Sequence, residues 1–248
     1  MSSGTGFKDH FSAQSAGYAR HRPTYPTALF EYLAGLGGRQ LVWDCATGNG
    51  QAAIALAGYF DRVIATDASA AQIDAAIEHP GVSYRVATAE ASGLEADSVN
   101  LVTVGQALHW FDTACFFAES SRVLAAGGCV AAWCYELCTV SPGCDSVVER
   151  LYTDITGPFW PPERRLIEER YAGIDFPGTA IEAPAFAMSV RWAADDMLGY
   201  LRTWSACQRY RRRRGDDPVG LIEDELRAAW GPDSRTVRWP LTVRISRL

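Results

Sequence analysis

One short stretch, Leu41 to Ala57, constrains the fold of this chain more than any other. The apolar residues at its start predict a buried strand that ends at Asp44. Small residues follow, and Gly48 and Gly50 among them allow a tight turn. From Gln51 onward, a run of alanine, isoleucine and leucine favours a helix packed closely on a sheet. Strand, glycine-containing turn and helix, in this order, are typical of the first half of a nucleotide-binding βαβ unit.

A second predicted strand supports this interpretation. The apolar segment that begins at Arg62 ends at Asp67, which follows Gly48 by 19 positions. This is close to the spacing of about 20 at which an acidic residue binds a ribose in such folds, because a carboxylate accepts hydrogen bonds from both hydroxyls. The alternative role for Asp67 is to cap a helix beginning near Ala70. The spacing favours ribose binding, so we predict an adenosine-containing cofactor.

The glycine turn also indicates which adenosine derivative binds. The chain lacks both the dinucleotide pattern Gly-x-Gly-x-x-Gly and the triphosphate-binding Gly-x-x-x-x-Gly-Lys-Ser/Thr. The pattern Asp44-x-Ala46-x-Gly48-x-Gly50 instead resembles motif I of the class I S-adenosylmethionine-dependent methyltransferases, with alanine where the first glycine is usual. Alanine is tolerated at that position unless the local φ is positive.

Three further segments resemble the same family. Residues 87–90, Ala-Thr-Ala-Glu, occupy the place of the adenine-contacting segment, although Thr88 stands where many members carry an acidic residue. Residues 106–111, Gln-Ala-Leu-His-Trp-Phe, resemble a motif of the small-molecule branch that includes trans-aconitate methyltransferase-like proteins. Residues 18–26 are similar to the Tyr-Ala-x-x-Arg-Pro-x-Tyr-Pro segment of that branch. Together the motifs cover about residues 7–135.

The resemblance implies roles for particular residues. Cofactor contacts are expected at Asp44, Ala46, Gly48, Gly50, Asp67, Ala68, Ala89, Glu90 and Gln106, and a reaction chamber at Tyr18, Arg22, His109 and Trp110. In this scheme Asp44 organises the loop, Asp67 holds the ribose and Gln106 flanks the methionine end. His109 is the candidate general base for a hydroxyl acceptor, whereas a carboxylate acceptor is ionised at neutral pH and needs no base. The alternative is that His109 is structural and Trp110 shelters the site.

Strands and helices alternate along the chain, which predicts an α/β fold with a doubly wound, Rossmann-like, mainly parallel seven-stranded sheet and a helical cap. Strands are expected at 41–44, 62–66, 82–86, 98–105, 129–135, 186–190 and 237–245, and helices at 27–36, 51–57, 70–77, 113–124, 145–155, 163–171, 195–214 and 217–230. The resemblance makes the last strand antiparallel and places it near the sheet edge.

The chain lacks internal repeats and low-complexity linkers, so we predict a single domain over residues 1–248. Its expected parts are an N-terminal arm or lid at 1–27, a cofactor-binding core at 28–138, a substrate-side insertion with cap helices at 139–234 and a closing strand at 235–248.

Charge and composition narrow the function. The formal net charge of −6 argues against a general nucleic-acid binder. Five arginines at 209–214 are interpreted as the end of a helix, where cations complement the helix dipole, with Asp216, Asp217, Glu223 and Glu225 neutralising them. The seven cysteines form no Cys-x-x-Cys pair, so we expect no metal and expect some of them on a buried strand. The polar start and the lack of a long apolar run favour the cytoplasm and no membrane association.

These observations predict an S-adenosylmethionine-dependent methyltransferase that acts on a small molecule, with an oxygen acceptor, carboxylate or hydroxyl, favoured. The alternatives are a cofactor-binding regulatory protein without turnover and, ranked lower, an NAD-dependent oxidoreductase. A nucleic-acid methyltransferase ranks lowest, because no Asn/Asp-Pro-Pro-Tyr/Phe motif follows the fourth predicted strand.

Overall fold

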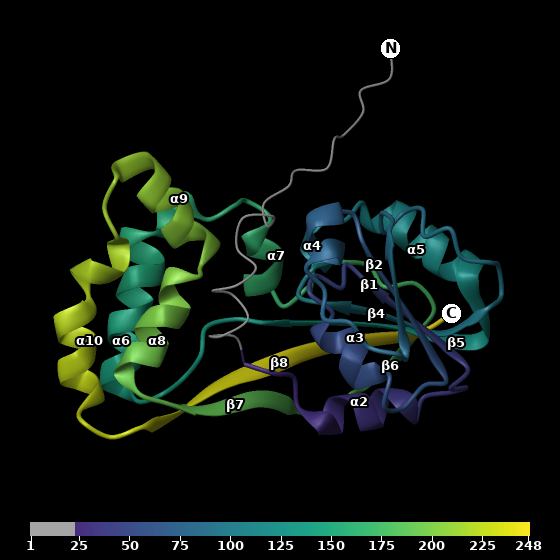
Figure 1. The fold of residues 1–248 in the computed structure, drawn as a ribbon, viewed down its shortest axis with the longest axis horizontal. Helices are drawn as coiled ribbons and strands as arrows, with labels where there is room; N and C mark the ends of the chain where they lie inside the picture. Colours follow the sequence, from purple (N-terminus) through teal and green to yellow (C-terminus); the bar gives the residue numbers. More distant parts are fainter. Residues whose placement is uncertain (1–22) are drawn as a thin grey trace, which may run out of the picture.

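A computed structural model describes residues 23–248 (Figure 1). Its strands are β1 Leu41–Cys45, β2 Arg62–Asp67, β3 Val82–Val86, β4 Val99–Gly105, β5 Leu124–Tyr135, β6 Thr179–Ile181, β7 Phe186–Trp192 and β8 Arg235–Arg247. They form one sheet in the order β3-β2-β1-β4-β5-β8-β6, and β7 also pairs with β8. Strands β1 to β5 pair in parallel, whereas β8 is antiparallel to β5. The predicted fold class, including the antiparallel strand near the edge, is confirmed.

Eight strands occupy seven positions in this sheet. Both β6 and β7 pair with β8, through Ile181 opposite Ile245 and Phe186 opposite Leu241, so the two short strands follow one another along the same edge. Pro184 lies between them, and proline cannot donate a hydrogen bond to a strand ladder. The prediction at 186–190 found β7, but it missed β6, which has only three residues.

Helices cover both faces of the sheet. The α-helices are α2 Thr27–Ala34, α3 Gln51–Leu56, α4 Ala70–Asp74, α5 Thr113–Val123, α6 Pro142–Arg150, α7 Arg164–Glu168, α8 Ala194–Arg202, α9 Ser205–Arg214 and α10 Glu223–Trp230. Short turns of other helix types are η1 Leu108–Trp110, η2 Leu151–Ile155, η3 Gly157–Phe159 and η4 Pro218–Leu221. Because side chains alternate along a strand, Val42 packs in one core cluster with α2 and α3, and Trp43 packs in the other with α5.

Several predicted helices end elsewhere in the structure. The helix expected at 70–77 ends at Asp74, because the amide of Ile77 donates to the carbonyl of Asn49 instead of continuing the helix. The helix expected at 195–214 is divided into α8 and α9. Trp204 between them adopts an extended backbone, and its buried ring contacts Tyr152 and Trp160. In these cases a tertiary contact overrides the local periodicity.

Other boundaries shift as well. The segment expected as one helix at 217–230 begins as η4 and continues as α10. The strand expected at 129–135 begins at Leu124, five residues earlier, since β5 also pairs with β4 at its start. The helix expected at 145–155 begins at Pro142 and ends in the π-type turn η2. Cys129 and Cys134 are buried on β5, as expected for cysteines acting as small apolar residues.

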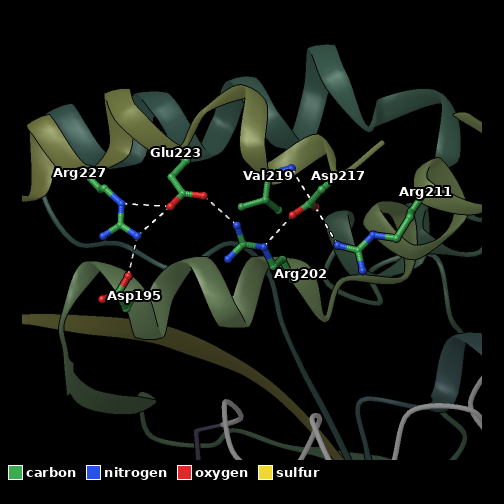
Figure 2. A network of polar contacts seen from close by, with 7 residues as sticks. All are labelled: Asp195, Arg202, Arg211, Asp217, Val219, Glu223 and Arg227. Atoms are coloured by element: carbon green, nitrogen blue, oxygen red, sulfur yellow. Dashed lines mark hydrogen bonds and ion pairs between the residues drawn. The ribbon is translucent and has the colours of Figure 1, made fainter. Parts of the chain in front are cut away.

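Residues 142–168 and 194–230 form a cap beside the sheet. Its helices α6, α8, α9 and α10 lie above the long ribbon made by β7 and β8, and α7 lies between them and the helices of the sheet (Figure 1). A chain of ion pairs ties the cap helices together (Figure 2). Arg202 binds Asp217 and Glu223, Arg227 binds Glu223 and Asp195, and Arg211 binds Asp217. The arginine-rich segment thus ends α9, as predicted, and Gly215 follows it with φ +89. Glu225 pairs with Arg150 of α6 and not with this cluster, which corrects part of the expected neutralisation.

No helix within residues 23–248 is long and apolar enough to cross a membrane.

Candidate functional site

The loop after β1 has an unusual backbone. Ala46, Gly48 and Gly50 all have positive φ, of 55, 57 and 88. An L-residue in this left-handed region costs about 1–2 kcal/mol, whereas glycine adopts it freely. The condition under which alanine is unfavourable in this motif is therefore met at Ala46, and the loop keeps its shape through the contacts described next.

Asp44 holds this loop through hydrogen bonds. Its carboxylate is buried and accepts hydrogen bonds from Thr47 Oγ1 at 2.6 Å and from Thr103 Oγ1 at 2.8 Å, which join β1, the loop and β4. Burial raises the pKa of Asp44 to about 6, and the two hydroxyl donors oppose that rise. The result is an acidic group fixed below the loop at the carboxyl end of β1.

Asp67 lies beside the same loop, at the end of β2. Its Oδ2 atom accepts from the Gly48 amide at 3.0 Å and its Oδ1 atom accepts from the Ser69 amide at 2.9 Å. The cap of α4 is Ser69, whose hydroxyl accepts from the Gln72 amide, so the alternative of Asp67 as helix cap is wrong. Ala68 connects Asp67 and Ser69. The structure thus brings the ribose candidate and the glycine loop together.

The two glycines of the loop serve different contacts. A Cβ atom on Gly48 would meet only Gln72 Oε1, 3.9 Å away, so the surface above Gly48 is open. A Cβ atom on Gly50 would collide with the ring and hydroxyl of Tyr84. Gly50 is thus required by a neighbouring side chain of β3. The open surface at Gly48, with the carboxylate of Asp67 beside it, fits an adenosine cofactor that carries positive charge.

The segment after β3 closes the other side of this region. Ala89 is buried, and Glu90 Oε1 accepts from the Asp112 amide at 3.3 Å, which links the segment to the start of α5. Asp112 in turn caps α5 by accepting from the Cys115 amide. These contacts hold Ala89 and Glu90 near the carboxyl ends of the strands, where the resemblance places the adenine.

Gln106 directly follows β4 and has a positive φ of 57. Its side-chain Nε2 donates to the Tyr135 carbonyl at 3.2 Å, and its Oε1 accepts from the Tyr135 amide at 2.9 Å. The side-chain amide thus extends the pairing of β4 with β5 beyond the last strand residue. This clamp fixes the direction in which the chain leaves β4 toward η1.

His109 lies in η1 and is buried. Its Nδ1 atom is 3.4 Å from the hydroxyl of Tyr171, and its ring contacts that of Trp110. Burial, and then the positive charge of Arg164, lower the pKa of His109 to about 3. The imidazole is therefore neutral at pH 7, which favours the structural alternative over a general base of ordinary strength.

A cavity of about 90 Å³ adjoins these residues. Its lining combines the chain after β4, the end of β5 and the cap. The lining side chains on which the argument below depends are Gln106, His109, Trp110, Trp160, Arg164 and Trp204. Sequence reasoning identified the first three and missed the last three, because those from the cap belong to no recognised motif and are at least 50 residues further along the chain.

Tyr18 and Arg22, predicted in the reaction chamber, lie outside the described residues, as does most of the expected lid. The described chain enters the fold beside the glycine loop. The Pro23 carbonyl accepts from Gln51 Nε2 at 3.3 Å, and the ring of Tyr25 packs edge-on against Trp133 with centroids 5.4 Å apart.

The fold is a Rossmann-like domain whose strand order reverses between β1 and β4, which is the place where folds of this kind bind nucleotide cofactors. Residues 43–132 match the family described as a methyltransferase domain. A protein of Dictyostelium discoideum assigned as a methyltransferase is 33% identical over 233 residues, covering 91% of this chain and 88% of the relative.

Solved structures of other proteins are also similar to this chain. A protein from Anaeromyxobacter dehalogenans assigned as a type II methyltransferase is 45% identical, with a TM-score of 0.86 over 91% of this chain and 97% of that chain. A protein from Anabaena variabilis, at 16% identity and a TM-score of 0.53 over 91% and 99% of the two chains, shows the shared fold alone. The chain belongs to the methyltransferase family and is an S-adenosylmethionine-dependent methyltransferase. It is therefore a transferase and not an NAD-dependent oxidoreductase.

Proposed function

We propose that this protein transfers a methyl group to an oxygen atom of a small-molecule acceptor, and that the acceptor occupies the cavity between η1 and the cap. The observation that carries the proposal is the joint lining of this cavity. Gln106, His109 and Trp110 come from the cofactor edge of the sheet, whereas Trp160 and Trp204 come from the cap. A molecule in this cavity is thus enclosed between the donor side and the cap helices. The likeness of residues 106–111 to the trans-aconitate methyltransferase-like branch supports a small acceptor.

The cofactor supplies a methyl group on a positively charged sulfur, and the chain's residues supply its binding and orientation. Asp67 would hold the ribose, and Ala68, Ala89 and Glu90 would border the adenine. Asp44, through Thr47, holds the loop, whose open surface at Gly48 would face the cofactor. Positioning of this kind provides most of the acceleration when the leaving group is already good.

The state of His109 favours an acceptor that is already ionised. With a pKa of about 3, the imidazole is a poor base toward a hydroxyl or phenol. A carboxylate carries its nucleophilic charge at neutral pH without help from the protein. We therefore place a carboxylate oxygen ahead of a hydroxyl, and we assign His109 to positioning through its contact with Tyr171.

Calorimetric titration with S-adenosylmethionine and S-adenosylhomocysteine tests the donor site. We expect Asp67→Ala to weaken binding at least tenfold, about 1.4 kcal/mol, while the wild type binds in the micromolar range. Asp61→Ala is the matched control, because Asp61 is exposed just before β2 begins, at the opposite end of the strand. Equal loss in both variants would contradict the assignment of Asp67.

Turnover separates an enzyme from a regulatory protein. Incubation with labelled donor and a panel of carboxylic acids, followed by phenols and alcohols, is expected to yield a labelled ester or ether. Tight donor binding without transfer to any member of either panel would favour the non-catalytic, cofactor-binding alternative.

A further inference from the structure

Arg164 differs from several other arginines of the cap in its surroundings. Arg202, Arg211 and Arg227 each bind a carboxylate (Figure 2), and Arg165 beside it pairs with Glu169. Among residues 23–248, Arg164 has no carboxylate partner, although its side chain is half-buried and lines the cavity. The carboxylate of Glu136 also lines the cavity, but it pairs with Arg170. A partly buried cation without a paired carboxylate is suited to a ligand that supplies the negative charge.

The guanidinium of Arg164 is fixed in place by aromatic residues. Its Cζ atom lies 4.8 Å from the ring centroid of Trp160 and 5.4 Å from that of Tyr152, and its Nε donates to the Tyr152 hydroxyl at 2.9 Å. Tyr152 is held in turn by a hydrogen bond to Glu168. In these contacts, the Arg164 guanidinium lies over two aromatic rings and donates through its Nε atom. The two terminal nitrogens, which bind a carboxylate in the bidentate geometry, have no partner within the described chain.

The surroundings of Arg164 describe the rest of the ligand. Trp110, Trp160 and Trp204 line the same cavity, and the Trp160 and Trp204 rings are in contact with centroids 5.6 Å apart. Indole faces favour flat, apolar groups. Arg164 and His109 line the same cavity, so the guanidinium lies on the side of the cap that faces η1. A cation and aromatic walls thus meet within reach of the donor side.

We propose that Arg164 is the anion-binding residue of the acceptor cavity and that the acceptor is a small aromatic carboxylic acid, whose carboxylate pairs with the terminal nitrogens of Arg164 while its ring lies against the tryptophans. This inference rests on the proposed function, because it names the acceptor of the same cavity. It also assigns acceptor choice to a cap residue that carries no motif of the cofactor site.

Binding of a matched pair of ligands tests the inference. Cinnamate and cinnamamide have nearly the same shape and differ in charge. Each is titrated calorimetrically into the protein saturated with S-adenosylhomocysteine. We expect the wild type to bind cinnamate at least tenfold more tightly than cinnamamide. In Arg164→Gln the preference should fall to twofold or less, chiefly through loss of cinnamate affinity, and Arg164→Lys should be intermediate because it keeps the charge without the planar fork.

Arg165→Gln is the matched control, since Arg165 is the next residue of the same helix but is exposed. It should keep the wild-type preference, and all variants should bind S-adenosylhomocysteine as the wild type does, which shows that the cofactor half remains folded. Equal affinity of the wild type for the two ligands, binding of neither ligand, or an unchanged preference in Arg164→Gln would overturn the inference. Failure of the wild type to bind S-adenosylhomocysteine would instead contradict the proposed function.

Discussion

The Nδ1 atom of His109 lies 3.4 Å from the hydroxyl oxygen of Tyr171, a residue 62 positions further along the chain. Tyr171 is fully buried. Its φ is 57, and the φ of its neighbour Arg170 is 56. Two consecutive non-glycine residues in the left-handed region are costly, of order 1–2 kcal/mol each. The turn after α7 has this unfavourable conformation, and it places the Tyr171 ring against η1. The orientation of His109 thus depends on the segment that follows α7.

The pH dependence of stability should report the buried His109. Its pKa falls from 6.5 in the unfolded chain to about 3 in the fold, so the unfolded state binds more protons between these values. Stability therefore decreases as the pH falls through this window. We expect His109→Gln to lack this loss of stability, which amounts to about 2 kcal/mol in the free energy of unfolding at pH 5. Urea unfolding of both proteins at pH 7.5 and pH 5 measures it, and parallel pH dependences would contradict the buried neutral state.

Ala46 should limit the stability of the cofactor loop. Because its φ is 55, Ala46→Gly relieves left-handed strain, and we expect a gain of about 1 kcal/mol in the free energy of unfolding. Ala55→Gly in α3 is the control, where glycine should cost about 1 kcal/mol because the helix backbone suits alanine. Denaturant unfolding distinguishes the two, and losses of similar size in both variants would show that Ala46 is unstrained.

Glu119 should stabilise the fold only when it is ionised. Its buried carboxylate pairs with Arg122 and accepts hydrogen bonds from the Ser92 amide and hydroxyl, and these interactions lower its pKa from 4.5 to about 2. The stabilisation is present above pH 4.5 and disappears as the pH falls toward 2. We expect Glu119→Gln to lose about 2 kcal/mol at pH 7. The gap to the wild type should narrow below pH 4.5.

Thermal or urea unfolding across this pH range follows that gap. The exposed Glu95→Gln serves as control and should change stability by less than about 0.5 kcal/mol. A gap for Glu119→Gln that stays constant down to pH 2.5 would mean that its hydrogen bonds, and not its charge, stabilise the fold.

Arg202 joins two acidic residues at the centre of the cap network (Figure 2). Its side chain is 36% exposed, so solvent screens both pairs, and we expect Arg202→Met to cost only about 1 kcal/mol in total. The cost should shrink in 1 M salt. Arg165→Met, which removes an exposed pair within α7, should stay within about 0.5 kcal/mol. An Arg202→Met effect that salt does not change would assign the loss to packing of the side-chain stem.

The motifs predicted which residues come together around the loop after β1, because the relevant contacts are local or lie at strand ends. Asp44 precedes its loop directly, and Asp67 reaches Gly48 because β1 and β2 are adjacent and parallel. Strand periodicity and glycine placement are sufficient to fix such relationships. The same reasoning predicted the helix end at Arg214, where Gly215 takes the left-handed conformation.

Other features depended on contacts between distant segments. The positive φ of Ala46, the division of α8 from α9 at Trp204 and the use of Gly50 to admit Tyr84 have no signature in the neighbouring residues. At Gly50 and Trp204 the contact is with side chains from elsewhere in the fold, and packing against them outweighs local propensity.

The parallel sheet, the loop after β1 and the family could be predicted from the sequence, because they follow from periodicity and from short motifs along contiguous residues. The lining of the cavity between η1 and the cap could not, because it depends on long-range packing. Arg164 and the tryptophans of the cavity are brought to His109 by the cap, whose packing on β7 and β8 sums many contacts between residues far apart in the chain. The protonation of His109 was decided there too, since burial and a neighbouring charge, and not residue type, set its pKa.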